Sequence, residues 1–489
     1  MTSKILGRSL GAGVPSAALR AARLPGKCLR SGTAASRYVP GVAELPRRLW
    51  PARRSPYDAE IWRLALPAFG ALAAEPLYVL VDTAIVGQLG TRQLAGLAIA
   101  GTVLTAAFAV FNFLAYSTTA AVARQIGAAH RRAAAALGVD GAWLAGALGV
   151  LLALVGLAAS SWIVDAMGAS AGVRPYALEY LRISLIGAPF MLLMLAGTGY
   201  LRGIQDTRTT LVIAVAANVV NLGLELLFVY GFHWGIAGSA IGTVLAQISA
   251  GVAYMVIVAR SARAEHSSLL PTSAGVRQTA VVGGPLIVRT ASLLAVFLAT
   301  TNLAARISDD AVAAHQIAFQ VFLFLALSLD ALAIAAQAMI GRSLGADDAL
   351  QARAVARRML EWGLVVGVGF GVVLAAVRPW LVPVFTDDAG VQDLADQLLL
   401  IVALLQPLNA IVFVLDGVLI GAGDQRFLAL AMIVATFGVY APVAAAVTIA
   451  GGGIIALWGA LALWFVARAI GLGIRYLSPR WQVTGALQP

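Results

Sequence analysis

Long apolar runs dominate the chain, and short polar segments separate them. A helix needs about 20 predominantly apolar residues to cross a bilayer, whereas a transmembrane barrel shows alternating segments of about ten residues. The pattern therefore predicts an all-α polytopic membrane protein. Twelve transmembrane spans are expected, near residues 61–87, 94–122, 133–159, 176–202, 208–231, 235–260, 276–304, 311–341, 352–385, 392–421, 427–450 and 453–477.

Composition and charge support this interpretation. Hydrophobic residues make up 60% of the chain and charged residues only 12%, against about 25% charged in a typical soluble protein. The net charge of +11 is concentrated in residues 1–57, which hold eleven Lys/Arg and one acid, so the remainder is nearly neutral. No nucleic-acid partner is therefore expected. A single cysteine, Cys28, excludes internal disulfides and cysteine metal clusters.

The distribution of arginine predicts the orientation. Thirteen arginines lie in the loops that follow even-numbered spans, and about four lie on the opposite side. The positive-inside rule then places both termini in the cytoplasm of a multi-pass cell (inner or plasma) membrane protein. We expect residues 1–57 to be a basic, disordered extension. An Arg-rich, acid-poor organellar transit peptide, which would imply an organellar membrane, is the alternative.

An internal repeat organises the spans. A shift of 218 residues brings Pro67 onto Pro285 and residues 123–128 onto residues 341–346. Because each half has an even number of spans, the halves are parallel repeats, which usually flank a central path. We expect two six-helix lobes around a central cleft. The boundaries are 58–260 for the N-lobe, 261–275 for a cytoplasmic linker, 276–478 for the C-lobe and 479–489 for a short tail.

Two acids lie within the first apolar span. Glu75, Tyr78 and Asp82 share one helix face because seven residues make close to two turns. A carboxylate at the bilayer centre costs roughly 2.5–3.5 kcal/mol on insertion scales, so these acids should face a bundle interior or a wet cavity. The repeat places Leu293 and Thr300 at the equivalent positions. The acids are therefore not required by the architecture and are functional candidates.

A second polar face lies in the 208–231 span. Asn218, Asn221 and Glu225 stand at i, i+3 and i+7, and none has a polar acid or amide equivalent in the second half. Carboxylate and amide oxygens suit Na⁺, and a poorly solvated carboxylate pair equally suits a proton. An interhelical hydrogen-bond network without an ion is the alternative.

The second half has unmatched residues of its own, Arg289, Asp330 and Asp416. Arg289 could pair with either acid and hold the bundle together, or these residues could serve in proton relay or substrate binding. Pro67 lies below the acids of the first span, where proline makes a helix easy to bend. It is the predicted hinge, although its repeat partner Pro285 indicates a partly architectural bend.

Several stretches together carry a family resemblance. They include Glu-Pro and Val-Asp-Thr-Ala-Ile-Val-Gly within residues 75–90, and Asn-Val-Val-Asn followed by Glu225. The others are residues 199–207, 329–337, 406–407 and 415–421. Over residues 58–478 the chain resembles the multidrug and toxic compound extrusion (MATE) family, and within it the DinF-like branch.

The resemblance implies a cation-coupled antiporter, not an enzyme, that exports amphipathic, often cationic compounds against inward H⁺ or Na⁺. It implies no cofactor, and we expect a monomer whose partners are the small-molecule substrate and the lipid bilayer. The implied cation site comprises Asp82, Asn218, Asn221, Glu225 and Thr243, with possible Na⁺ binding at Asp82, Asn221, Glu225 and Thr243. Glu75, Tyr78, Arg289, Asp330 and Asp416 remain substrate-cleft or relay candidates. The family usually has aspartate at position 225, so glutamate extends the reach by one methylene.

Two other functions remain open. A lipid-linked precursor flippase of the same superfamily would need basic residues in its cleft, and Arg289 is the one intramembrane candidate. A membrane-embedded transferase would need facing acidic motifs. The paired acids Asp309-Asp310 and Asp387-Asp388 are expected in outer loops instead, without a facing motif.

Overall fold

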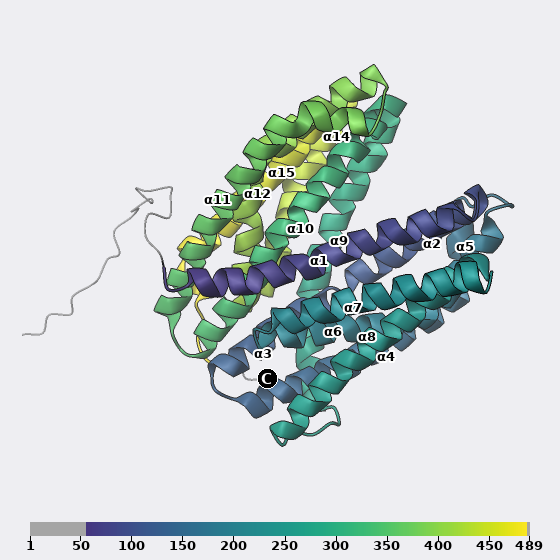
Figure 1. Ribbon diagram of the computed structural model, residues 1–489. Coiled ribbons are helices and arrows are strands. Elements are labelled where there is room, and N and C mark those ends of the chain that lie inside the picture. Colours follow the sequence, from purple (N-terminus) through teal and green to yellow (C-terminus); the bar gives the residue numbers. More distant parts are fainter. Residues whose placement is uncertain (1–54, 487–489) are drawn as a thin grey trace, which may run out of the picture. The chain divides into compact units, whose positions relative to one another are not determined.

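The helices follow the predicted spans. The computed structural model describes residues 55–486, so the predictions for the N-terminal tail lie almost wholly outside the described residues. Eleven helices are long and apolar enough to cross a membrane, and α5 with α6, bent by 50°, makes the twelfth span. The described residues contain no strand. The twelve-helix prediction is therefore confirmed (Figure 1).

The first-half helices are α1 (Asp58–Gly87), α2 (Thr91–Val110), α3 (Phe113–Gly127), α4 (Arg131–Ala166), α5 (Arg174–Ile186), α6 (Ala188–Gly203), α7 (Thr207–Glu225), the π-helix η1 (Leu226–Gly231) and α8 (Gly235–Ala264). The second-half helices are α9 (Ser273–Ile307), α10 (Asp309–Gly345), α11 (Ala349–Leu381), η2 (Val382–Val384), α12 (Ala389–Gly421), α13 (Gln425–Ile433), the π-helix η3 (Val434–Tyr440), α14 (Ala441–Ile449), α15 (Ile454–Leu477) and η4 (Pro479–Trp481). Several helices begin before the predicted runs, because their first turns carry polar residues that an apolar pattern omits.

The backbone repeats the sequence shift of 218 residues. Positive φ angles occur at Ala129 (61°) and at its equivalent Asp347 (58°), and again at Gln205 (66°) and its equivalent Gly423 (77°). Non-glycine residues rarely adopt this conformation. The same tight turns therefore follow equivalent helices in the two halves, which supports the parallel repeat.

The two halves meet through a symmetric pair of glycines. A Cβ on Gly127 would collide with the carbonyl oxygen of Arg342, and a Cβ on Gly345 would collide with the carbonyl oxygen of Arg124. Both glycines are therefore needed for the close approach of α3 and α10. Arg124 adds hydrogen bonds to the carbonyl oxygens of Ala422 (2.6 Å) and Gly485 (3.1 Å). We call this end of the helices, where Asp58, Gly127 and Gly345 lie, the inner end.

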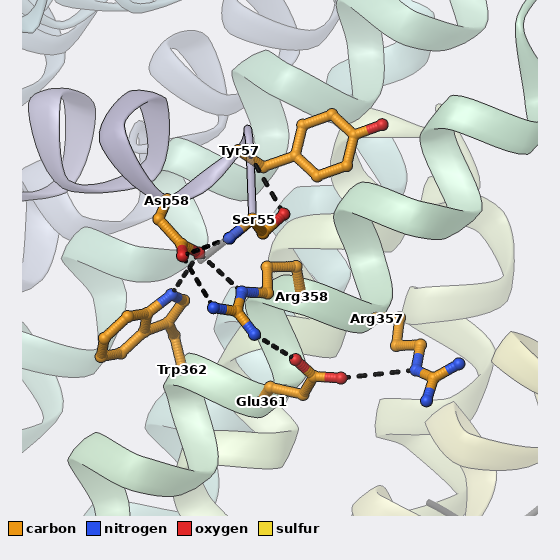
Figure 2. A network of polar contacts seen from close by, with 7 residues as sticks. All are labelled: Ser55, Tyr57, Asp58, Arg357, Arg358, Glu361 and Trp362. Atoms are coloured by element: carbon orange, nitrogen blue, oxygen red, sulfur yellow. Dashed lines mark hydrogen bonds and ion pairs between the residues drawn. The ribbon is translucent and has the colours of Figure 1, made fainter. Parts of the chain in front are cut away.

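A charged network joins α1 to α11 at the inner end. The Asp58 carboxylate accepts two hydrogen bonds from Arg358, at 2.6 and 2.7 Å, and a third from the Trp362 indole at 2.9 Å. Arg358 also donates to Glu361 at 2.7 Å, as Figure 2 shows. Such bidentate, charge-assisted bonds are among the stronger polar contacts in proteins. We call Asp58, Arg358, Glu361 and Trp362 the inner latch.

Weakening the inner latch is expected to open the inner end. Asp58→Asn removes the negative charge that Arg358 grips, and the open fraction should rise at least about tenfold, which corresponds to 1.4 kcal/mol. Nitroxide labels at His130 and Leu350, in a Cys28→Ser background, report the separation of the two halves by pulsed EPR. Leu350 is 85% exposed and therefore accepts a label.

The matched control for the inner latch is Asp165→Asn. Asp165 pairs with Arg174 at 2.5 Å, with both side chains about half exposed. Exposed pairs contribute little, so this variant should keep the wild-type distances. Identical distance distributions for Asp58→Asn and wild type would show that the inner latch does not hold the ends together.

Candidate functional site

Asp82 is buried between helices of the first half. Its side chain lies on α1, the residue is 4% exposed, and it accepts hydrogen bonds from Ser239 on α8 (2.5 Å) and Tyr180 on α5 (3.2 Å). A buried carboxylate requires hydrogen bonds or a counter-charge. Each of its oxygens has one hydrogen bond, yet the residues that donate them are neutral. The charge is therefore held in place without being neutralised by its donors.

Glu225 faces Asp82 from the last residue of α7. It is fully buried, and neither carboxylate oxygen accepts a hydrogen bond from a described residue. Its neighbours are Asp82, Asn221 and Thr243, and the two carboxyl groups lie within hydrogen-bonding range of each other. Two ionised carboxylates cannot hydrogen-bond, because both only accept. A proton or another cation between them would satisfy both.

Thr243 completes the cluster. Its hydroxyl hydrogen-bonds the Tyr78 hydroxyl at 2.8 Å and accepts from the Asn221 amide at 3.3 Å. Thr243 lies on α8, Tyr78 on α1 and Asn221 on α7. The predicted residues Asp82, Asn221, Glu225 and Thr243, with Tyr78, are thus brought together, and we call them the N-lobe acidic site.

Local sequence explains how α7 and α8 approach closely enough to form this site. A Cβ on Gly242 would lie 3.3 Å from Cγ and N of Glu225, and one on Gly238 would lie 3.0 Å from the Phe228 backbone. Small residues four apart let membrane helices pack closely. The π-helix η1 also begins directly after Glu225, and π-helical turns are frequent at functional sites. The sequence reading did not identify this π-helical segment.

Two predicted residues lie apart from the carboxylate pair. Asn218 donates to the carbonyl oxygen of Ala74 at 2.7 Å and so connects α7 to the backbone of α1. Glu75 is exposed and forms no hydrogen bond within the part of the chain that the structure describes. Although Glu75 and Asp82 were expected on one face, only Asp82 is enclosed.

The helix α1 contains two prolines, Pro67 and Pro76. Pro67 has a repeat equivalent, whereas position 294, opposite Pro76, is leucine. Pro76 also lies two residues after Ala74, which Asn218 contacts. The comparison of halves therefore adds Pro76 as a second hinge candidate, which the sequence reading overlooked.

The second half contains a charged group of its own. Asp416 on α12 is 5% exposed, and one of its oxygens accepts from Arg289 on α9 (2.5 Å) and from Arg468 on α15 (2.7 Å). Arg468 also lies 4.7 Å from the Trp464 ring centroid, a cation–π contact. Asp416 is therefore the acid that Arg289 binds. Asp330 lies near Arg202 and Arg289 but forms no hydrogen bond with a described residue.

Three residues at these sites were missed from the sequence. Tyr180 and Ser239 bind Asp82, and Arg468 binds Asp416. Their repeat equivalents are apolar, namely Leu398, Leu457 and Ala250. The same comparison of halves that selected Asp82 would have found them if it had been extended to tyrosine, serine and the final span.

The donor set determines which cations the N-lobe acidic site suits. Within residues 55–486, no group of three or more His, Cys, Asp or Glu side chains is placed to hold a metal ion. Two carboxylates with an amide and a hydroxyl oxygen fit a hard monovalent cation or a proton. The unpartnered Glu225 oxygens provide the free acceptors that such a cation requires.

Comparisons with known proteins agree with this geometry. A family model described as MatE matches residues 67–227 and 285–446, two segments that begin 218 residues apart. The chain is 34% identical over 393 residues to Protein DETOXIFICATION 44, chloroplastic, from Arabidopsis thaliana, covering 77% of this chain and 74% of that protein. It is 29% identical over 420 residues to DNA damage-inducible protein F from Escherichia coli (strain K12), covering 85% and 91%. The fold matches the solved structure of a MOP superfamily transporter from Pyrococcus furiosus, with TM-score 0.77 and 20% identity, over 87% of this chain and 95% of that one.

Proposed function

We propose, since the chain belongs to the multidrug and toxic compound extrusion (MATE) family of efflux transporters, that it exports amphipathic, cationic compounds in exchange for an inward-moving cation. As a MATE protein it is a multi-pass secondary transporter and not an enzyme. The comparisons favour this efflux function over the lipid-linked precursor flippase.

The observation that carries the coupling proposal is the buried pair Asp82–Glu225. Neither acid has a cationic side-chain partner in an item of the described structure's hydrogen bonds or ion pairs, and Glu225 lacks any hydrogen bond there. Two negative charges this close in a poorly solvated site cannot both stay ionised without a cation. The pair is therefore the proposed binding site for H⁺ or Na⁺.

The proposed mechanism links cation binding to the shape of α1. The N-lobe acidic site connects α1 to α5, α7 and α8 through Asp82 and Tyr78. Neutralising Asp82 removes its repulsion from Glu225 and lets α1 change its curvature at Pro67 or Pro76. The substrate binds while the inner end is open. It leaves outward after the cation arrives from outside.

The inner latch supports the outward-facing assignment of this structure. The Arg358–Asp58 and Arg342–Glu60 pairs connect the two halves at the inner end. We assign the inner end to the cytoplasm from the arginine distribution, which places both termini there, and we propose that the transporter acts as a monomer. Alternating access then corresponds to opening and closing of this end.

Reconstituted transport tests the proposed function. Liposomes containing the purified full-length protein should accumulate or extrude rhodamine 6G against its gradient when an inward-directed cation gradient is imposed. An imposed pH difference and an imposed Na⁺ gradient, applied separately, identify the ion. Transport that runs only down the dye gradient under both conditions would contradict antiport.

A further inference from the structure

A charged cluster joins the two halves outside the N-lobe acidic site. It comprises Tyr116 (α3) and Arg202 (α6) from the first half with Arg289, Asp330, Asp416 and Arg468 from the second. Three arginines face two aspartates, so the formal charge of the cluster is positive. We call it the inter-lobe arginine cluster.

The acids of this cluster leave one arginine without a partner. Asp416 is shared by Arg289 and Arg468 through the same oxygen. Arg202 is only 7% exposed, yet it forms no hydrogen bond or ion pair with a described residue, and its Nε is buried and unpartnered. The Nε of Arg289 is likewise buried without a partner. A buried, uncompensated guanidinium is strongly unfavourable, so the cluster is incomplete as the chain alone builds it.

The missing group must be an anion that a guanidinium can grip. Guanidinium groups present a planar fork of donors that matches a carboxylate in a bidentate arrangement. The Tyr116 hydroxyl lies near Arg202 and forms no hydrogen bond with a described residue, so it supplies a further donor. Asp330, also near Arg202 and Arg289, limits the excess to one positive charge. A single carboxylate therefore fits better than a multiply charged anion.

We propose that the inter-lobe arginine cluster binds a carboxylate carried by the transported compound, so that substrates with both a cationic and a carboxylate group are preferred. This inference rests on the proposed export function and names a substrate class for it. The cluster draws residues from both halves, so a carboxylate bound there contacts both. Separation of the halves would then weaken its binding, which suits release during transport.

A matched pair of dyes tests the inference. Rhodamine B carries a cationic xanthene and a free carboxylate, whereas its ethyl ester differs only in lacking the carboxylate charge. In fluorescence anisotropy with the full-length protein in nanodiscs, the acid should bind at least about tenfold more tightly than the ester. Arg202→Gln should remove this preference and leave ester binding unchanged. Arg208→Gln, which alters an exposed arginine just beyond α6, should retain it.

The outcomes separate the two proposals. Equal binding of acid and ester by the wild type, or a preference that survives Arg202→Gln, overturns the inference. If neither dye binds, thermal stabilisation by sodium benzoate but not by benzamide with sodium chloride must depend on Arg202, and its absence also overturns the inference. Stabilisation by chloride equal to that by benzoate would indicate an inorganic-anion site and would equally reject it. Cation-driven export of the ester without a carboxylate preference would leave the proposed function standing alone.

Discussion

Asp82→Asn is expected to abolish uphill export while leaving the transporter folded. Asparagine has the same shape, its oxygen can still accept from Ser239, and its amide can donate to the Tyr180 hydroxyl. Only the negative charge that binds the cation is lost. One charge moving inward across 100 mV supplies about 2.3 kcal/mol, which supports a gradient of about fiftyfold. The variant should support no gradient above that of protein-free liposomes.

The measurement is dye accumulation in liposomes under the cation gradient, with dye exchange at equal concentrations as the folding control. Asp82→Asn should retain exchange, because substrate can still cross down its gradient. Asp165→Asn, the same chemical change at an exposed ion pair, should export normally. Wild-type uphill export by Asp82→Asn would remove Asp82 from the coupling mechanism.

Asp416→Leu is expected to destabilise the protein strongly. The substitution leaves Arg289 and Arg468 without their shared carboxylate, and Arg468 is only 4% exposed. Removing one partner of a buried ion pair costs about 3–5 kcal/mol, because the remaining charge is buried and unpaired. Unfolding of the purified protein, followed by intrinsic tryptophan fluorescence, should therefore begin at a markedly lower temperature.

Two further variants identify the cause. A triple variant, Asp416→Leu with Arg289→Met and Arg468→Met, removes all three charges and should recover most of the lost stability. Asp396→Asn breaks the partly exposed pair with Arg378 (2.9 Å) and should cost no more than about 1 kcal/mol. Unchanged stability in Asp416→Leu would show that the ion pairs do not hold α9, α12 and α15 together.

The helices and the repeat could be predicted because they depend on local composition. Crossing a bilayer requires long apolar runs, and the shift of 218 residues preserves the prolines and glycines that shape both halves. The equivalent glycines Gly127 and Gly345 show the consequence, since each meets the backbone of the other half. The sequence pattern did not reveal that contact, because it forms only when the halves pack.

The candidate site was predictable in its acids and less so in their neighbours. Asp82 and Glu225 were identifiable because charged residues in apolar spans are costly. Ser239 lies 157 residues from Asp82 and Tyr180 lies 98 residues away. Neutral polar residues are common in membrane helices, so nothing local marked these two as ligands of the acid. The Asp58–Arg358 pair spans 300 residues and was missed for the same reason.

Cation movement driven by substrate is the most direct measurement of the central claim, that Asp82 and Glu225 carry the coupling ion. Liposomes loaded with rhodamine 6G and a pH- or Na⁺-sensitive dye are diluted into dye-free buffer at zero membrane potential. We predict that outward movement of rhodamine 6G through the wild type draws H⁺ or Na⁺ inward at a fixed ratio, and that Asp82→Asn with Glu225→Gln abolishes this counter-flow. Counter-flow at the wild-type ratio in the double variant, or substrate export by the wild type without movement of either ion, would contradict the account.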